Sequence, residues 1–231
     1  MARMRAAKAK LKEILQRNDW QGQLGEIAAG GMSNVGALFS FLLLDPLMRH
    51  KAAVALGRTA AKIAAENPEA ARNIIRRFIW HMSEESGNIG WGIPEAFAEC
   101  LAASPELAKT YHKILISYIV DLGFDDNYCD NDQLRRSCYW AIGRLARTRP
   151  ELASGARQWL LKGLQDKDSI CRGMAAWALT QLPPDIMNAP AMRQLAECGD
   201  NDECEIFDGN NKMDLFTVSE LAQKALARDK N

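Results

Sequence analysis

Three segments of the chain align on an arginine, and this repeat limits the possible folds more than any other feature. Arg49, Arg135 and Arg172 each follow an Asp or Asn by four residues and precede an alanine–aliphatic pair by six. The segments begin at residues 45, 131 and 168, so that 86 and 37 residues separate their starts. Because the first interval equals two repeats, we predict a poorly matching copy near residue 88. A period of roughly forty residues is typical of stacked helical pairs, since one pair cannot bury its apolar face alone.

A second marker alternates with the first. The dipeptide Pro-Glu occurs at 68–69, 105–106 and 150–151, each time before residues with the apolar spacing of a helix. Proline suits the first helical position because its missing N–H would have no partner there, and glutamate favours the positive end of the helix dipole. Each repeat is therefore predicted to contain two helices, A and B, with this marker at the start of helix B.

The first pattern, Asp-x-x-aliphatic-Arg-x-x-Ala-Ala-x-Ala-Leu-Gly, resembles the HEAT repeat. More narrowly, it is similar to the short bacterial form named after phycobilisome (PBS) lyase subunits. The resemblance covers residues 45–198 and implies an all-α, right-handed α-solenoid of HEAT-like helical hairpins. It says little about activity, because such repeats occur in lyases, in scaffolds and in proteins of other kinds.

The sequence predicts a single solenoid domain over residues 1–231. Residues 1–44 are expected to form N-terminal cap helices, and residues 45–198 four repeats that start near 45, 88, 131 and 168. Residues 199–231 are expected to add a small β-hairpin, turning at 208–211, and a last helix that opens with a capping box at Thr217 and Glu220. A solenoid needs such polar ends to prevent stacking with other molecules.

The acid and the arginine of each A helix are interpreted as a structural ladder of hydrogen bonds between neighbouring repeats. Arginine suits this role because its rigid fork pairs well with carboxylates. The predicted ladder comprises Asp45, Arg49, Asn131, Arg135, Asp168 and Arg172. In the second repeat, Asn88 replaces the acid and Gly92 replaces the arginine, so that one step of the ladder is missing.

Two B-to-A connections, residues 83–90 and 121–132, are longer than the others. Insertions of consecutive repeats lie along one edge of a solenoid, which is often the edge that binds. The resulting hypothesis is a partner-binding edge made of Glu84, Glu85, Asn88, Trp91, Glu95, Tyr128, Asp130 and Arg136. Two interpretations of Trp91 remain open: it is an exposed contact residue, or it fills the space of the missing arginine.

Composition restricts the function. Lys plus Arg and Asp plus Glu are 29 each, so the net charge of zero gives no general attraction to nucleic acid. An apolar run near 18 residues is missing, which argues against a membrane span. The six cysteines show no metal or disulfide spacing, and the N-terminus lacks the apolar core of a secretory signal, so a reducing cytoplasm is expected.

These patterns favour a non-enzymatic scaffold or adaptor, a monomer that binds another protein or a peptide and carries no catalytic residue, metal or cofactor. The resemblance also implies an alternative, a lyase-like or chaperone-like maturation factor for a cofactor-bearing protein. A third interpretation is a HEAT-like alkylpurine DNA glycosylase. For its cleft, aromatic residues would come from Trp80, Trp140, Trp159 and Trp177, and one basic stripe from Arg72, Arg76 and Arg77. The zero net charge argues against it.

Overall fold

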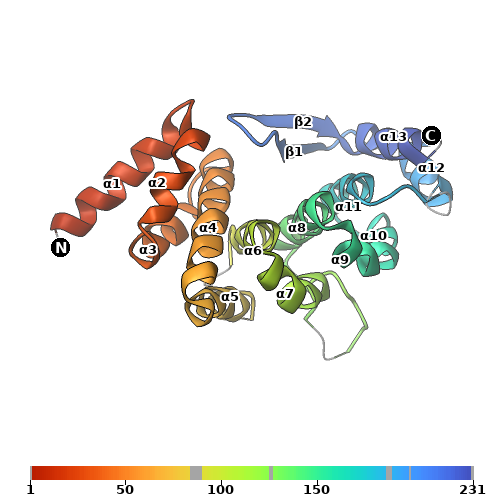
Figure 1. The fold of residues 1–231 in the computed structure, drawn as a ribbon. Coiled ribbons are helices and arrows are strands. Elements are labelled where there is room, and N and C mark those ends of the chain that lie inside the picture. Colours follow the sequence, from red (N-terminus) through yellow and green to blue (C-terminus); the bar gives the residue numbers. More distant parts are fainter. Residues whose placement is uncertain (1, 84–89, 125–126, 186–188, 198, 230–231) are drawn as a thin grey trace. The chain divides into compact units, whose positions relative to one another are not determined.

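A computed structural model describes residues 2–83, 90–124, 127–185, 189–197 and 199–229. The chain is mostly helical, with one small antiparallel sheet near its C-terminal end, and the predicted fold class is confirmed (Figure 1). The residues group into two compact units. The first unit holds Met1–Ala108 together with Phe207–Met213, and the second holds Lys109–Ile206 together with Asp214–Asn231.

The first unit is built around one long helix, α4 (Pro46–Glu66), which packs against most of the other helices of this unit. Before it come α1 (Ala2–Gln16), the short 3-10 turn η1 (Trp20–Gln23), α2 (Leu24–Ala29) and α3 (Met32–Phe41). After it come α5 (Pro68–Met82) and α6 (Ile93–Ala103). The alanine-rich face of α4, with Ala52, Ala55 and Ala60 fully buried, lets α6 approach closely.

Helix pairing follows the sequence markers. Helices α5, α7 (Pro105–Ser117) and α9 (Pro150–Ala153) each begin at the proline of a Pro-Glu marker. The side chain of Asn67 accepts a hydrogen bond from the Ala70 amide at 3.1 Å and so caps α5 directly after α4 ends. Helices α4, α6 and α8 (Asp132–Thr148) are thus each followed by the next helix after a single residue, whereas α11 (Ser169–Gln181) and α12 (Ala189–Glu197) are separated by a longer connection.

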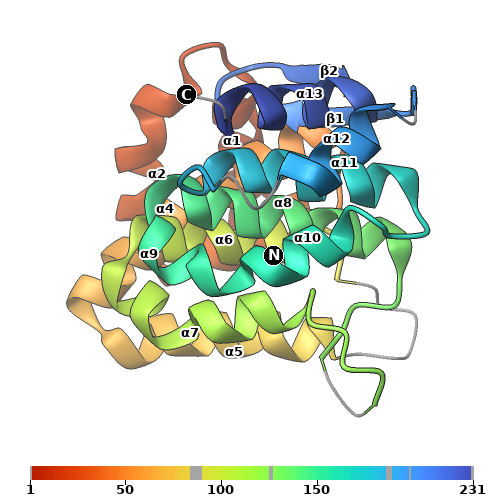
Figure 2. The same cartoon turned by 90° about the vertical axis from the view of Figure 1, so that its right-hand side faces the viewer.

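The second unit repeats this arrangement. Helix α8 (Asp132–Thr148) is followed by α9, the 3-10 turn η2 (Ser154–Ala156) and α10 (Arg157–Gly163), and then by α11 (Ser169–Gln181) and α12 (Ala189–Glu197). Helix α11 packs against α8 on one side and against α13 (Val218–Asp229) on the other (Figure 2). The predicted capping box is present: the Glu220 amide donates to Thr217 Oγ1 at 3.2 Å, and the Thr217 amide donates to Glu220 Oε2 at 2.8 Å.

The predicted hairpin consists of β1 (Glu203–Phe207) and β2 (Met213–Thr217). Its turn belongs to the first unit, where it is held by four side-chain hydrogen bonds. Trp20 Nε1 donates to the Asn210 carbonyl at 2.9 Å, and Gln21 Nε2 to the Gly209 carbonyl. Lys51 Nζ donates to Asn211 Oδ1 at 2.7 Å, while Asn211 Nδ2 donates to the Asn18 carbonyl at 3.0 Å.

Candidate functional site

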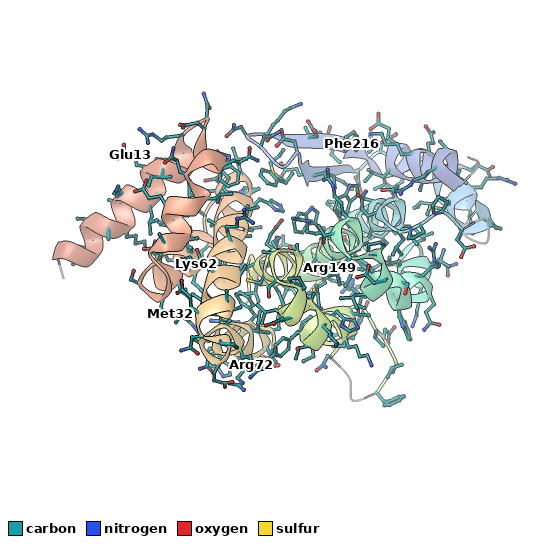
Figure 3. The ribbon with its side chains drawn as sticks, in the orientation of Figure 1. Glu13, Met32, Lys62, Arg72, Arg149 and Phe216 are labelled. Carbon is teal, nitrogen blue, oxygen red and sulfur yellow. The ribbon has the colours of Figure 1, made fainter. Side chains whose placement is uncertain are left out.

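Helix α5 presents a row of polar and aromatic side chains to solvent. Its apolar residues Ala71, Ile74, Ile75 and Phe78 are buried, and helical spacing places the remaining residues on the opposite face. We call this face the α5 surface; it comprises Glu69, Arg72, Asn73, Arg76, Arg77 and Trp80. Arg72 lies on this exposed side of the helix (Figure 3).

Trp80 is the notable residue of this surface. Its side chain is 58% exposed, and among the strongly exposed large apolar residues that the structure describes it is the only aromatic one on a helix. The His81 ring meets the Trp80 indole edge-on, with ring centroids 5.0 Å apart, and so supports one side of it. Trp80 therefore offers a large apolar face that the fold does not use for its own core.

The arginines of the α5 surface are held in place by neighbours. Arg72 Nη1 lies 3.2 Å from Glu69 Oε2, and Arg76 Nη1 contacts both Glu69 Oε1 and Asn73 Oδ1. These hydrogen bonds lower the pKa of the Glu69 carboxyl, which stays ionised. The Arg77 guanidinium lies 4.1 Å over the Phe39 ring. With three arginines and one glutamate, the surface carries an excess of positive charge around Trp80.

The predicted partner-binding edge is described only in part. Glu84, Glu85 and Asn88 lie outside the described residues. Trp91 is half-buried, so its two interpretations remain open, whereas Glu95 is 3% exposed and is not displayed at the surface. Trp91 and Glu95 belong to the first unit; Tyr128, Asp130 and Arg136 belong to the second. The assembly of these residues into one edge stays a prediction.

Gly92 has a structural reason for replacing the expected arginine. Its φ is +75°, and a Cβ at this position would lie 2.7 Å from Leu42 Cβ and 3.1 Å from Arg49 Cγ. Arg49, from the preceding repeat, donates through Nε to the Leu42 carbonyl at 3.1 Å. The backbone at Gly92 therefore passes close to the Arg49 side chain, in a conformation that favours glycine.

In the second unit, the residues of the predicted ladder do not pair with one another. Asn131 and Asp168 cap helices, and the arginines form ion pairs with other acids. Asn131 and Asp168 cap α8 and α11 by accepting from the amides of Leu134 and Cys171 at 2.9 and 2.8 Å. In the first unit Asp45 caps α4 in the same way, through the Met48 amide at 3.0 Å. The acids that pair with Arg135 and Arg172 are other residues, which are described next.

Arg135 is 1% exposed and forms five hydrogen bonds. Its Nε and Nη2 donate to the two carboxylate oxygens of Asp166 at 2.7 and 2.8 Å, and Nη2 also donates to Asp132. Its Nη1 donates to the carbonyls of Cys129 and Asp130. Arg172 repeats this pattern: Nη1 donates to the Asp166 carbonyl at 2.9 Å and Nη2 pairs with Asp200.

Arg136 is engaged by Asp168, with Nε and Nη2 at 2.9 and 2.6 Å from its carboxylate oxygens. Burial opposes ionisation of Asp168, but the hydrogen bonds from Arg136 and from the Cys171 amide prevail and lower its pKa to about 2. Tyr128 is half-buried, with the Arg135 guanidinium 5.3 Å from its ring centroid, while Asp130 is exposed. Arg136 thus has a structural partner at the position proposed for binding.

The sequence contained a signal for these pairs that the alignment on arginine missed. Asp-x-Asp occurs three times, at 130–132, 166–168 and 200–202, each time before an A helix or before β1. In two of these motifs the first aspartate, Asp166 or Asp200, accepts a hydrogen bond from the arginine of the preceding repeat. The second aspartate is held by Arg135, by Arg136 or by Ser169 Oγ. An alignment on aspartate would have shown the pairing.

The described part of the chain holds no group of three or more His, Cys, Asp or Glu side chains that could bind a metal ion. His50 is buried against Phe207, with ring centroids 5.1 Å apart, and burial lowers its pKa to about 3, so it is neutral. Within the described residues, none of the helices is both long enough and apolar enough to cross a membrane.

Comparison with known proteins identifies the fold of this arrangement. Residues 132–182, which form α8 to α11, match the model of the HEAT-like repeat family. An uncharacterized protein from Archaeoglobus fulgidus is 37% identical over 84 residues. This alignment covers 36% of the chain and less than half, 43%, of the archaeal relative.

Solved structures extend the likeness to nearly the whole chain. A designed armadillo repeat protein in complex with the peptide (KR)4 has a TM-score of 0.52 at 16% identity and covers 95% of this chain and 98% of that chain. An engineered protein has a TM-score of 0.52 at 18% identity, covering 97% of this chain and 54% of that chain. Such low identity shows the fold alone. The chain has the helical-repeat fold shared by armadillo and HEAT-like proteins.

Proposed function

We propose that the protein is a non-enzymatic scaffold that binds another protein or a peptide, and that the α5 surface is part of its binding surface. The observation that carries the proposal is Trp80, 58% exposed within a row of arginines. Tryptophan and arginine are enriched among the residues that dominate binding energy at interfaces. A tryptophan that the fold leaves in water gains free energy when a partner covers it.

The fold supports the same proposal. Helical repeats form extended surfaces that suit peptides and proteins, and the similar designed armadillo repeat protein is in complex with the peptide (KR)4. The (KR)4 peptide is basic. The α5 surface is itself basic, with three arginines and one glutamate, and would therefore favour an acidic peptide instead. We therefore expect its partner segment to contain acidic residues and one apolar side chain that covers Trp80.

Peptide display on the whole chain tests the proposal. Peptides enriched on the wild-type protein are synthesised, and their affinities for wild type, Trp80→Ala and Phe124→Ala are measured by fluorescence anisotropy. Phe124 is the matched control, since it is an aromatic residue that is 72% exposed outside the α5 surface. We expect Trp80→Ala to weaken binding by about 2 kcal/mol or more, roughly thirtyfold, and Phe124→Ala to leave it unchanged.

Equal affinity of the enriched peptides for wild type and Trp80→Ala would exclude the α5 surface as the binding surface. Salt-sensitive binding of a duplex oligonucleotide, lost in Trp80→Ala and accompanied by base excision, would instead favour the glycosylase interpretation.

We propose that this scaffold is a cytoplasmic monomer. The narrower resemblance to PBS-lyase repeats supports one alternative, a lyase-like or chaperone-like maturation factor. Incubation with a linear tetrapyrrole followed by gel filtration separates the two. A visible absorption band that elutes with the protein supports the alternative, and a colourless protein peak supports the scaffold.

A further inference from the structure

The net charge of zero conceals an uneven distribution of charge along the chain. Residues 1–17 contain six of the 29 Lys and Arg residues but only one of the 29 Asp and Glu residues, so the rest of the chain is acidic overall. Nearly all of this segment forms α1. Lysine and arginine residues gathered along one helix are a signature of surfaces that bind phosphate groups. An anionic partner would therefore be attracted to α1, although the whole chain gives no such attraction.

Helix α1 is attached to the first unit by one side of its second half. Leu11, Ile14 and Leu15 are buried there, and α1 packs against α3, α4 and η1. In contrast, every residue from Arg5 to Lys10 is exposed. The N-terminal turns of α1 extend beyond α2 and α3 of the same unit (Figure 1). A partner can therefore reach the first half of α1 from several sides.

The exposed cations of α1 lie on two flanks of the helix. Because an α-helix turns by about 100° per residue, Arg5, Lys8 and Lys12 fall within one narrow sector beside the buried side. Lys10 falls on the opposite flank by the same geometry. All four side chains are exposed.

Two contacts confirm that the flanks face different neighbours. Lys8 Nζ lies 5.6 Å from the centroid of the Phe41 ring in α3, whereas Lys10 Nζ lies 2.9 Å from Glu26 Oε1 in α2. The Lys10 side chain is still 69% exposed. An ion pair so exposed contributes little free energy, so a phosphate can replace the Glu26 carboxylate as the partner of Lys10.

Small side chains separate the two flanks. Ala6 and Ala9 lie between them, on the side opposite the buried residues, so that the helix is narrow there. An α-helix fits the major groove of B-form DNA, and cations on both of its flanks then point towards the two phosphate backbones. Glu13 lies one turn beyond Ala9 on the same side, and phosphates would repel its carboxylate. This favours contact through the first half of α1.

The residues of α1 fit other anionic partners less well. Helices that bind a bilayer surface insert large apolar side chains, and protein partners are anchored mainly by aromatic and apolar contacts. On α1 the exposed residues between the cations are alanines, and the large apolar residues Leu11, Ile14 and Leu15 are buried. Single-stranded nucleic acid is held by stacking on aromatic side chains, which the sequence of α1 lacks. Duplex DNA needs only the charges.

We propose that the first half of α1 binds duplex DNA without sequence preference, with Arg5, Lys8, Lys10 and Lys12 contacting phosphates on both sides of the major groove. This activity goes beyond the scaffold function and uses a surface other than the α5 surface. Its strength comes from the release of counterions from the phosphates, so it falls steeply as the salt concentration rises.

Titration of the whole chain with a fluorescently labelled duplex of random sequence tests the proposal by anisotropy. Four phosphate contacts predict a slope of about −3 to −4 for the logarithm of the binding constant against that of salt, a loss of roughly a hundredfold between about 50 and 200 mM. Absence of duplex binding at the lower salt concentration would overturn the proposal. Tighter binding of the single strand, or sedimentation with phosphatidylserine vesicles without duplex binding, would overturn it as well.

The triple variant Arg5→Gln, Lys8→Gln and Lys12→Gln removes one flank. We expect the slope to become smaller by about three and the affinity at low salt to fall at least tenfold, since each lost phosphate contact reduces the slope by about one. All three positions are exposed, and circular dichroism confirms that the variant is folded. An unchanged slope would show that α1 does not contact the DNA.

A matched triple variant removes the same charge elsewhere. Lys109, Lys113 and Arg147 are exposed residues of the second unit, and their replacement by glutamine should leave both affinity and slope at the wild-type values. An equal loss in both triple variants would mean that net charge rather than α1 controls binding. Trp80→Ala should bind the duplex as wild type does and excise no base. Duplex binding and peptide binding thus fail independently.

Lysine acetylation of the wild-type protein provides a test that needs no variant. The protein is acetylated briefly with and without the duplex at low salt, and each lysine is quantified by mass spectrometry. We expect the duplex to protect Lys8, Lys10 and Lys12, and to leave Lys109 and Lys113 as reactive as before. Unchanged acetylation of α1 at a saturating concentration of duplex would contradict the assignment.

Discussion

At position 92, the close approach of Leu42 and Arg49 restricts the residue to glycine. Alignment on arginine identified Gly92 as a missing step of the ladder, and the structure shows why an arginine does not fit there. The φ of +75° is costly for residues with a Cβ, and the Leu42 carbonyl would lie 2.8 Å from that Cβ. The side chain of Arg49 occupies the adjacent space.

Gly92→Ala is expected to destabilise the protein by about 2 kcal/mol or more, because strain at positive φ adds to overpacking against Leu42. Gly36→Ala is the control. Gly36 lies on an exposed part of α3 with open space around its Cβ position, so this change should stabilise by up to about 1 kcal/mol. Urea unfolding measures both. An unchanged midpoint for Gly92→Ala would show that the turn relaxes freely.

Two tryptophans give a matched pair. Trp20 is 0% exposed and donates to the Asn210 carbonyl, so Trp20→Ala should cost about 3–5 kcal/mol of unfolding free energy. Trp80 lies mainly in solvent, and Trp80→Ala should change stability by no more than about 0.5 kcal/mol. Thermal and urea unfolding of the two variants check this difference. A large loss for Trp80→Ala would make this residue a packing element and remove the basis of the α5 surface.

Elements of the second unit are joined by ion pairs, of which Arg135–Asp166 is buried and Arg136–Asp168 and Arg172–Asp200 are partly buried. The sequence predicted where helices start, because proline and Asp or Asn act locally at a helix N-terminus. Spacing alone could not predict which acid meets Arg135, since the pair with Asp166 connects residues 31 positions apart and depends on how α8 and α11 pack. The same limit applies to Arg136 and Asp168.

Arg135→Met should destabilise the protein by about 3–5 kcal/mol, because it leaves the buried Asp166 carboxylate without its main cation. The double variant Arg135→Met with Asp166→Leu should recover part of this loss, since no charge is then left buried. Arg147→Met, on the exposed side of α8, is the control and should have little effect. Urea denaturation gives the coupling energy, and strictly additive losses would argue against the pair.

The lowered pKa of Asp168 predicts how the free energy of unfolding depends on pH. Its pKa is lowered from 3.8 to about 2, so the folded state holds its proton less strongly than the unfolded state does. The stabilisation of the folded state by the ionised Asp168 carboxylate is complete above about pH 4 and is lost as pH falls towards 2. Asp168→Asn should therefore reduce stability at neutral pH and flatten the acid part of the stability curve. A curve parallel to wild type between pH 5 and 2 would contradict the assigned pair.

At the scale of the whole molecule, the sequence predicted the fold class because a repeated amphipathic pattern has few ways to bury its apolar face. It predicted the hairpin at 203–218 from turn residues and alternating apolar residues. It did not predict that Phe207–Met213 belong to the same unit as Met1–Ala108, since contacts of such long range leave no periodic signal. For the same reason, the exposure of Trp80 became clear only when the packing of α5 was known.

The place of residues 207–213 in the first unit has a consequence for protein synthesis. The carbonyl that the Trp20 indole binds belongs to Asn210, which is translated 190 residues after Trp20. At about 5–20 residues per second, roughly 10–40 seconds of translation separate the two. During this interval the nascent chain exposes the site that will receive the turn, around Trp20 and Lys51. The first unit is therefore completed only after residues 207–213 have been translated, and a chain that ends before residue 207 has an unfinished first unit.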